Sequence, residues 1–574
     1  MKRKISKAVE IDRVPAVSAI MWFESVISAL PSFLFGYGIS ALNTVLVVGD
    51  AGSEACLSGA DPTCPTGSVL QDLNLPTVQQ ELATSLLIAG AWLGSMMASR
   101  PSDALGRRAT LLYNNVLFIA GGALCALARG SSILFLGRFL GGMAVGCGSG
   151  VVPVLLSEVS SPKNRGAVGS IHQLMINLGV LCSGLLGYAL VEDVNHGWRY
   201  VQGFFVIPAI AQIALSKFVP ESPRWLVKQD RVAEAKMVMR KLHLGKGADA
   251  RQKGEELDQE VDGMGGSKGE NTKGSVTWAE VCAHRKPVMI GVMLMLVQAF
   301  TGINTVIFYS TTIFEMAGVD NTVLATVSVG LTLVVMTVVS GGLVDKAGRR
   351  RLMLFGTAVM AVALATLSGS LFLLNGSPKT QGCLAVAATL LFIAGFSLGQ
   401  GAVCWIVLTE IVPSRIRAQA FSVFTAVNWL SNLVIGLFTL SAIDFMGKWL
   451  LPASSDGSSG DDGSDGGGGG GDSPSKNQLK AGVAGLYAVF CVLSLLAVIF
   501  IHFFVRETMG KSLEELEEGG KGNVSDGGDD LPFGLGGIND EDEDVATGLL
   551  RQSEQRDDGV VLTTDEEEMR RVML

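Results

Sequence analysis

The sequence has 574 residues, of which 48% are hydrophobic and only 17% charged, and its formal net charge is −9. A soluble protein is expected to carry roughly a quarter charged residues, so the composition excludes an ordinary soluble domain. Much of the acidity lies at 514–568 and in an Asp/Gly tract at 456–472, and no basic patch with interleaved aromatic residues points to nucleic acid.

The apolar residues lie in blocks of roughly 20, the length that a helix needs to cross a bilayer. The blocks are continuous and lack the alternation of barrel strands, so they predict membrane-spanning helices. The expected spans of the first half are 17–42, 80–100, 109–128, 132–155, 167–190 and 198–219. Those of the second half are 286–310, 321–344, 351–374, 382–408, 418–446 and 480–504. The predicted fold class is an all-α membrane protein with twelve transmembrane helices.

Polar segments flank and separate these helices. The chain is divided into an N-terminal segment, a first half, a linker, a second half and an acidic, largely disordered tail, at 1–16, 17–219, 220–285, 286–504 and 505–574. Within the linker, 231–244 has the spacing of a short amphipathic helix. Lys and Arg gather in the loops on one side, which predicts that both termini and the linker face the cytosol.

The loop after the first span contains Cys56 and Cys64 and is expected to lie outside. That compartment permits a disulfide between them, and two free thiols are the alternative. The first apolar block lacks a small-residue cleavage site, so it is interpreted as a retained helix rather than a signal peptide.

An internal repeat relates the two halves. The motif Asp-x-x-Gly-Arg-Arg occupies 103–108 and recurs at 345–350, each time after the second helix of its half. Each half also has a Glu followed seven residues later by an Arg, namely Glu158 with Arg165 and Glu410 with Arg417. The shared order of both motifs predicts two pseudo-symmetric six-helix halves.

Together these motifs resemble the sugar porters of the major facilitator superfamily over nearly the whole chain, up to about Leu516. Further markers, in the order of the family, are Gly137-Arg138, His172-Gln173-Leu174, Pro-Glu-Ser-Pro-Arg-Trp at 220–225, Gly302-Ile303-Asn304 and Glu507-Thr508. The likeness is greatest to the facilitative glucose transporters of animals and the plastid-type glucose transporters of plants. It implies transport of a hexose-type sugar by alternating access, with no enzymatic chemistry, cofactor or metal.

The resemblance also implies a substrate site near the membrane midplane, between the halves. The contacting positions would be Phe35, Gln173, Gln298, Asn304, Trp405, Asn428 and Asn432. Buried amides in apolar helices are costly, which indicates function, although adhesion between helices is the alternative. Several family positions differ, among them Ala299, Leu333, Ser397 and Gln400, so the hydroxyl pattern of the sugar stays open.

Charged residues at the cytosolic helix ends are expected to form an inner gate of ion pairs that opens when the halves separate. A static positive-inside signal with salt bridges that fold the loops is the alternative. The predicted inner-gate residues are Asp103, Arg107, Glu158, Arg165, Glu221, Arg224, Asp345, Arg349, Glu410 and Arg417.

One position bears on proton coupling. Proton-coupled relatives carry Asp after the Phe-Gly-Tyr of the first helix, whereas this chain has Gly38 there and retains the matching Arg138. A carboxylate that alternates between arginine and a proton would thus be missing, which favours facilitated diffusion. The only other acid of that helix is Glu24.

Two rival functions stay open: a proton-coupled sugar or polyol symporter, and a transporter-like sugar sensor that signals through its tail. The expected partners are a small sugar and the lipid bilayer, with no nucleic acid, and the functional unit is expected to be a monomer. The plasma membrane is the favoured location, because no plastid transit peptide is recognised, and an endomembrane is the alternative.

Overall fold

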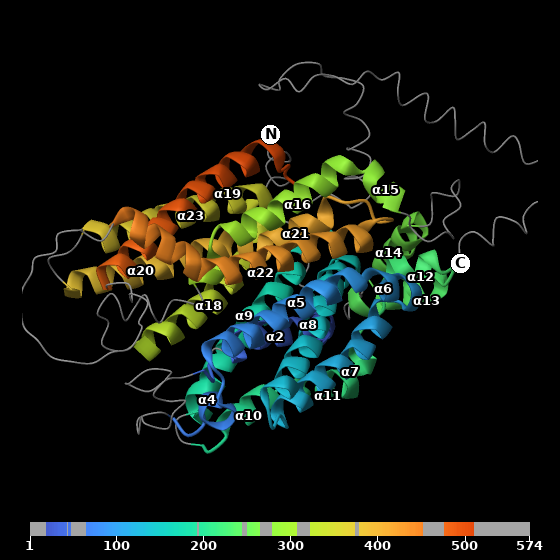
Figure 1. Cartoon of the computed structure of the whole chain (residues 1–574). Coiled ribbons are helices and arrows are strands. Elements are labelled where there is room, and N and C mark those ends of the chain that lie inside the picture. Colours follow the sequence, from blue (N-terminus) through green and yellow to red (C-terminus); the bar gives the residue numbers. More distant parts are fainter. Residues whose placement is uncertain are drawn as a thin grey trace, which may run out of the picture. The chain divides into compact units, whose positions relative to one another are not determined.

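A computed structural model describes residues 19–42, 44–46, 65–191, 194–243, 250–264, 278–306, 322–373, 378–451 and 476–509. All of these belong to one compact unit that spans Met1–Glu518. Within the described part, nine helices are long and apolar enough to cross a membrane, or eleven if each of two bent helix pairs is one span. The all-helical architecture expected from the sequence is confirmed (Figure 1).

The first half contains α1 (Ala19–Ser28), α2 (Leu30–Ala41), α4 (Val69–Leu73), α5 (Thr77–Met97), α6 (Ser99–Leu105), α7 (Arg107–Ala126), α8 (Ser131–Val159), α9 (Arg165–Val191), α10 (Gly197–Gly203), α11 (Val206–Ala214) and the 3-10 turn η1 (Ser216–Phe218). The linker region contains α12 (Pro223–Lys228), α13 (Val232–His243), α14 (Ala250–Met264) and α15 (Trp278–Ala283). The second half contains α16 (Arg285–Phe300), α18 (Thr322–Ala347), α19 (Arg349–Leu373), α20 (Pro378–Phe396), the π-helical turn η2 (Ser397–Gly401), α21 (Ala402–Glu410), α22 (Arg417–Leu450) and α23 (Lys476–Phe504).

Three of the predicted spans are bent or broken near a proline, which explains each break. The span at 17–42 bends by 43° between α1 and α2, and the span at 80–100 bends by 42° between α5 and α6. Pro31 and Pro101 lack the N–H that would bond to the carbonyl four residues earlier. In the same way, Pro208 follows the break between α10 and α11, within the predicted span at 198–219.

A side chain from another helix compensates the first break. The carbonyl left without a partner by Pro31 is that of Ile27, and Gln212 of α11 donates its Nε2 to this oxygen at 2.8 Å. Gln212 in turn accepts from Asn115 of α7 at 2.9 Å. The bend in the first span is therefore anchored by a buried polar chain rather than left to flex.

Helices of the first half approach one another through glycine. A Cβ on Gly36 of α2 would lie 1.8 Å from the Ile176 oxygen of α9, and one on Gly146 of α8 would lie 1.9 Å from the Ala91 oxygen of α5. Such backbone contact is how helices associate where no hydrophobic effect drives them together. These contacts hold α2 against α9 and α5 against α8.

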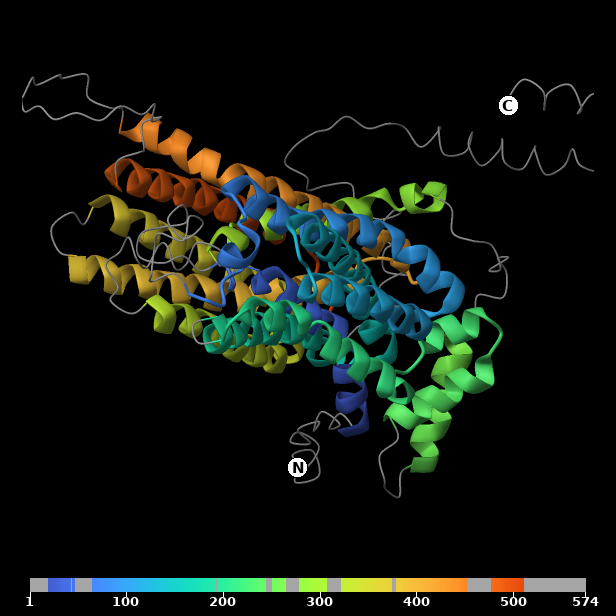
Figure 2. The ribbon, with the colours of Figure 1, turned by 60° about the horizontal axis from the view of Figure 1, so that its bottom comes forward.

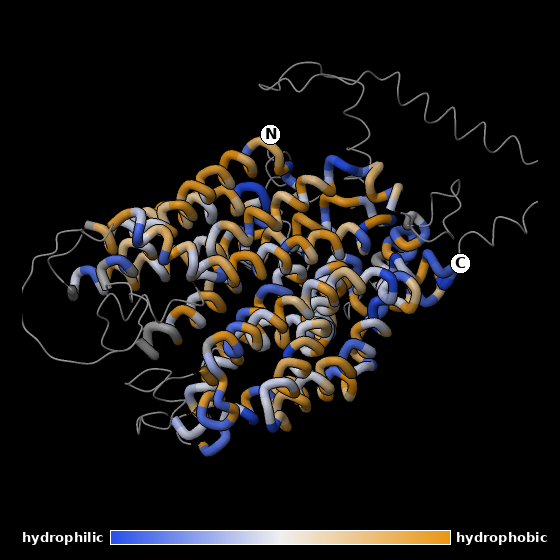
Figure 3. The backbone as a smooth tube through the Cα atoms, viewed as in Figure 1, coloured by the Kyte–Doolittle hydropathy of each residue, from blue (hydrophilic) through white to orange (hydrophobic). Residues whose placement is uncertain are grey.

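The halves meet along two main seams, one between α9 and α18 and one between α5 and α22 (Figures 1 and 2). The long helices are lined with hydrophobic residues, whereas hydrophilic residues concentrate in α12–α14 (Figure 3). Many large apolar side chains on these helices are exposed, for example Leu136, Val335 and Phe438. An apolar surface of this extent is typical of a chain surrounded by lipid.

Candidate functional site

Four of the predicted sugar contacts form a directional chain of amide hydrogen bonds in the second half. Asn304 donates to Asn432 at 2.6 Å, Asn432 donates to Asn428 at 3.0 Å, and Asn428 donates to Gln298 at 3.0 Å. Gln298 then donates its Nε2 to the Gln400 carbonyl at 2.7 Å. A backbone carbonyl can only accept, so this last contact fixes the direction of the whole chain. Each amide still has hydrogen-bonding capacity for a ligand hydroxyl.

Local backbone geometry places this chain. Asn304 lies in a helical turn at 303–306, directly after Gly302, whose φ is +86°. A Cβ on Gly302 would lie 2.4 Å from the Phe490 ring of α23, so this turn needs glycine both for its conformation and for space. The acceptor Gln400 belongs to the π-helical turn η2, a distortion frequently found at functional sites.

The predicted contact of the first half approaches the same turn from the other side. Gln173 is buried and lies against Gly401, where a Cβ would be 3.6 Å from its Cγ. Its Nε2 donates to Asn177 at 3.0 Å. The amides of the two halves therefore meet at η2.

Aromatic rings from both halves pack beside these amides. The rings of Phe35 and Trp429 have centroids 4.8 Å apart, and those of His172 and Trp405 are 5.0 Å apart. Trp429 donates to Ser149 of α8 at 3.1 Å, and His172 bonds Ser32 at 2.7 Å. Rings of this kind can cover the weakly apolar faces of a sugar.

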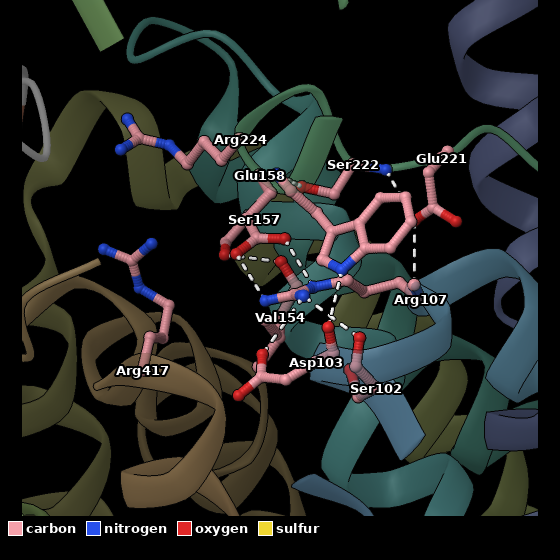
Figure 4. A network of polar contacts seen from close by, with 12 residues as sticks. Ser102, Asp103, Arg107, Val154, Ser157, Glu158, Glu221, Ser222, Arg224 and Arg417 are labelled. Carbon is pink, nitrogen blue, oxygen red and sulfur yellow. Dashed lines mark hydrogen bonds and ion pairs between the residues drawn. The ribbon is translucent and has the colours of Figure 1, made fainter. Parts of the chain in front are cut away.

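Three predicted inner-gate residues of the first half, Asp103, Arg107 and Glu158, lie together with Glu221 and Arg224 of the linker (Figure 4). Arg107 reaches both oxygens of Glu158, at 3.0 and 3.3 Å, and lies 3.3 Å from Asp103. The Glu221 carboxylate accepts from the backbone N–H groups of Arg107 and Ser222 at 2.8 and 2.9 Å. Burial nevertheless raises the pKa of Glu221 above its ordinary value.

The second half repeats this arrangement. Arg349 lies 3.4 Å from Glu410 and 3.0 Å from Asp345. The place of Glu221 is taken by Glu507, which accepts from the backbone N–H of Arg349 at 2.8 Å and of Arg350 at 3.2 Å. The sequence identifies Glu507 only as a family marker, and the predicted inner gate does not include it.

Most of the close ion pairs lie within a half, but several contacts cross between the halves. The Asp345 carboxylate accepts from the backbone N–H groups of Gly166 and Ala167, at 3.1 and 2.8 Å, at the start of α9. Arg165 lies 3.9 Å from Glu410. Gln419 also donates to Asp103, and Arg224 of the linker donates to Ser414 of the second half.

Arg417 supports the loop that precedes it and also acts on the opposite half. It donates to the carbonyls of Thr409 and Val412 at 2.9 and 3.2 Å. Its charge acts on Glu158 of the first half, as Arg165 of the first half lies near Glu410 of the second half (Figure 4). Both copies of the motif therefore place an arginine toward the glutamate of the other half.

The coupling position has a defined geometry. Arg138 is buried, with its Nη1 donating to the Gly38 carbonyl at 3.0 Å and its Nε to the Ala83 carbonyl at 3.2 Å. Among the described residues, no carboxylate forms an ion pair with it. A Cβ on Gly38 would lie 2.6 Å from the Phe205 ring, so a side chain here would require that ring to move.

The remaining acid of the first span, Glu24, is engaged elsewhere. Its carboxylate is buried and lies 2.5 Å from the Lys241 Nζ of α13. This contact ties the linker to α1 and directs Glu24 away from Arg138.

The candidate disulfide between Cys56 and Cys64 lies outside the described residues. In the part of the chain that is described, no group of three or more His, Cys, Asp or Glu residues could hold a metal ion.

A family model described as sugar (and other) transporter matches residues 25–519. The chain belongs to this family. It is 34% identical over 425 residues to plastidic glucose transporter 4 of Arabidopsis thaliana, a match that covers 73% of this chain and 72% of the relative. It is 32% identical to the facilitated glucose transporter member 3 of solute carrier family 2 from Canis lupus familiaris, over 76% of this chain and 86% of the relative.

Among solved structures, the proton:xylose symporter XylE bound to 6-bromo-6-deoxy-D-glucose is similar, with a TM-score of 0.66 and 26% identity. The match covers 87% of this chain and 99% of that one. The sugar porter therefore has the major facilitator fold, and it is a multi-pass membrane protein of a family that transports sugars. The resemblance and the fold class inferred from the sequence are confirmed.

Proposed function

We propose that this sugar porter carries a hexose, with glucose as the first candidate, down its gradient by alternating access. The observation that supports the substrate class most directly is the chain from Asn304 to the Gln400 carbonyl. In this chain the direction of each hydrogen bond between the four amides is fixed, and aromatic rings lie beside it. Such amides offer the alternating donors and acceptors that a ring of hydroxyls requires. The names of two relatives given above include glucose, which agrees with this choice.

Facilitated diffusion is supported by the surroundings of Arg138. Two of its N–H groups donate to backbone carbonyls, and Gly38 has no room for a side chain unless Phe205 moves. A proton carrier would need a carboxylate that exchanges between the arginine and a proton. The alternative, proton symport of a sugar or polyol, is favoured by one structural relative, which is a proton:xylose symporter.

The cycle uses the contacts between the halves. The contacts of Asp345 with the start of α9 and of Arg165 with Glu410 support a state in which the inner gate closes the cytosolic side. Rocking one half against the other would part these contacts and open the site to the cytosol. No covalent step takes part, and we place the functional monomer in the plasma membrane, with an endomembrane as the alternative.

The test is uptake of labelled glucose into liposomes that contain the purified protein, with and without an imposed proton gradient. We expect uptake to equilibrate and to be independent of the gradient. Gln298→Ala should reduce it about 5- to 150-fold, because a buried amide chain that loses one member costs about 1–3 kcal/mol. Uphill uptake driven by protons would refute facilitated diffusion, and no glucose flux by correctly inserted protein would refute glucose as the substrate.

A further inference from the structure

A buried asparagine, Asn177, connects the predicted sugar contact Gln173 to the opposite half of the molecule. Asn177 lies one helical turn after Gln173 on α9, and both side chains are buried. Its Oδ1 accepts from Gln173, while its Nδ2 donates to Thr337 Oγ1 at 2.8 Å and to the Leu333 carbonyl at 3.2 Å. Thr337 and Leu333 belong to α18, in the second half.

The direction of these bonds follows from chemistry. The two ends of an amide have the same shape, so only their neighbours can decide which end is nitrogen. The Leu333 carbonyl can only accept, and it therefore requires the Nδ2 end of Asn177. The Thr337 hydroxyl donates to the Leu333 carbonyl oxygen at 2.7 Å. The Thr337 oxygen can then only accept from Asn177 Nδ2. The Oδ1 of Asn177 must then face Gln173.

An amide oxygen can only accept, so Gln173 must turn its Nε2 toward Asn177. We propose that Asn177 is a positioning residue that commits the Oε1 of Gln173 to the substrate, so that the carrier selects a sugar hydroxyl able to donate at that point. This inference rests on the proposed function, since it takes Gln173 as a sugar contact.

The anchor of this orientation lies in the other half. Gln173 belongs to the first half, but the carbonyl that sets its direction belongs to α18. The amide of Gln173 is therefore held only while α9 and α18 stay together at this level. When rocking parts that seam, Gln173 becomes free to rotate, and the bond to the sugar hydroxyl weakens at the stage at which the sugar is released.

A fluorinated sugar distinguishes this role from a merely structural one. Fluorine in place of a hydroxyl accepts weakly but cannot donate. Each monofluoro-deoxyglucose is tested as a competitor of labelled glucose uptake and compared with glucose itself. At one ring position the wild type should bind the fluoro sugar about tenfold more weakly, the loss expected for one hydrogen bond.

In Asn177→Leu the Gln173 amide can turn its Nε2 toward the fluorine. The ratio of glucose affinity to fluoro-sugar affinity, about ten in the wild type, should therefore fall toward one. The isosteric Thr337→Val removes one of the two acceptors and should lower the ratio partly. Matched controls are Asn114→Leu, which removes a buried amide bonded to the Ala144 carbonyl of its own half, and Thr389→Val. Both should keep the wild-type ratio.

An unchanged ratio in Asn177→Leu and Thr337→Val, with uptake retained, would overturn the proposal and leave the proposed function standing. If Asn177→Leu does not reach the membrane, Thr337→Val against Thr389→Val decides. Absence of glucose uptake by the wild type would overturn the proposed function and this proposal together.

Discussion

Gly106 and Gly348 occupy the same place in the two Asp-x-x-Gly-Arg-Arg motifs, and each is required for two reasons. Their φ values are +93° and +91°, in a region that side chains rarely adopt. A Cβ would also lie 2.3 Å from a Glu221 oxygen at the first and 2.5 Å from a Glu507 oxygen at the second. The glycine of the motif thus admits the carboxylate that accepts from the following N–H groups.

We expect Gly106→Ala to destabilise the first half by about 1–3 kcal/mol, the usual cost of forcing a side chain into such a backbone conformation. The measurement is thermal unfolding of the purified protein in detergent. Gly184→Ala is the control, because a Cβ there meets nothing within 4 Å. Equal melting temperatures for both variants would contradict the role of Gly106.

Glu221 gives a prediction about pH. Its pKa in the folded protein is raised, so its contribution to stability is fully present below the unfolded pKa of about 4.3 and is lost as pH rises through the higher folded value. Glu221→Gln cannot titrate. The stability of the wild type relative to this variant should therefore decrease with rising pH in that window and stay level above it. An increase over the same window would show that the backbone donors outweigh burial.

At the scale of the helix, Asp345 joins the end of α18 to the start of α9. It accepts from two backbone N–H groups of the other half and pairs with Arg349 four residues on. Hydrogen bonds to a charged group contribute about 1.5–3 kcal/mol each. Asp345→Ala should therefore loosen the inner gate.

This loosening can be measured by labelling Ser157→Cys with an impermeant maleimide from the cytosolic side, in a background without the exposed Cys282 and Cys383. Ser157 lines a small cavity between Trp405 and Arg165. Asp345→Ala should speed labelling at least tenfold. Asp444→Ala, which removes an exposed ion pair of the same i,i+4 spacing, should not. Equal rates would mean that Asp345 only folds its own loop.

The helices also show which features of the fold and site could be predicted from the sequence and which could not. The spans and the repeat follow from apolar length and motif spacing, and these depend on local sequence. Pro31 and Pro101 are a local signal for two of the helix breaks, because proline disfavours the helical conformation of the residue before it. The orientation of Gln298 and Asn428 had no local signal, because it depends on how α16, η2 and α22 approach one another. Asn177 could have been found from its i+4 spacing to Gln173, on the same helix face.

At the scale of the whole molecule, the described contacts of the inner gate end at Glu507, Thr508 and Met509. A protein truncated after Glu518, where the compact unit ends, retains all of them. We expect its glucose uptake per molecule at the membrane to stay within about twofold of the full chain. Loss of uptake at normal expression would assign the tail a part in transport.

The truncation also tests the sensor alternative, because a transporter-like receptor needs its tail to signal. A sugar-dependent growth response that is lost on truncation while uptake persists would favour that alternative. A response that persists would remove the main reason for considering it.

Glu221 and Glu507 each lie just after the last helix of their half. Each carboxylate accepts from a backbone N–H at the start of an earlier helix of the same half, α7 for Glu221 and α19 for Glu507. The segment after each half is therefore hydrogen-bonded to that same half. These two bonds do not require that the linker joins the halves in one polypeptide. A chain severed between Met264 and Trp278 would yield two self-contained fragments that meet at the α9–α18 and α5–α22 seams. Co-expressed as separate polypeptides, they should reconstitute a split carrier that takes up sugar.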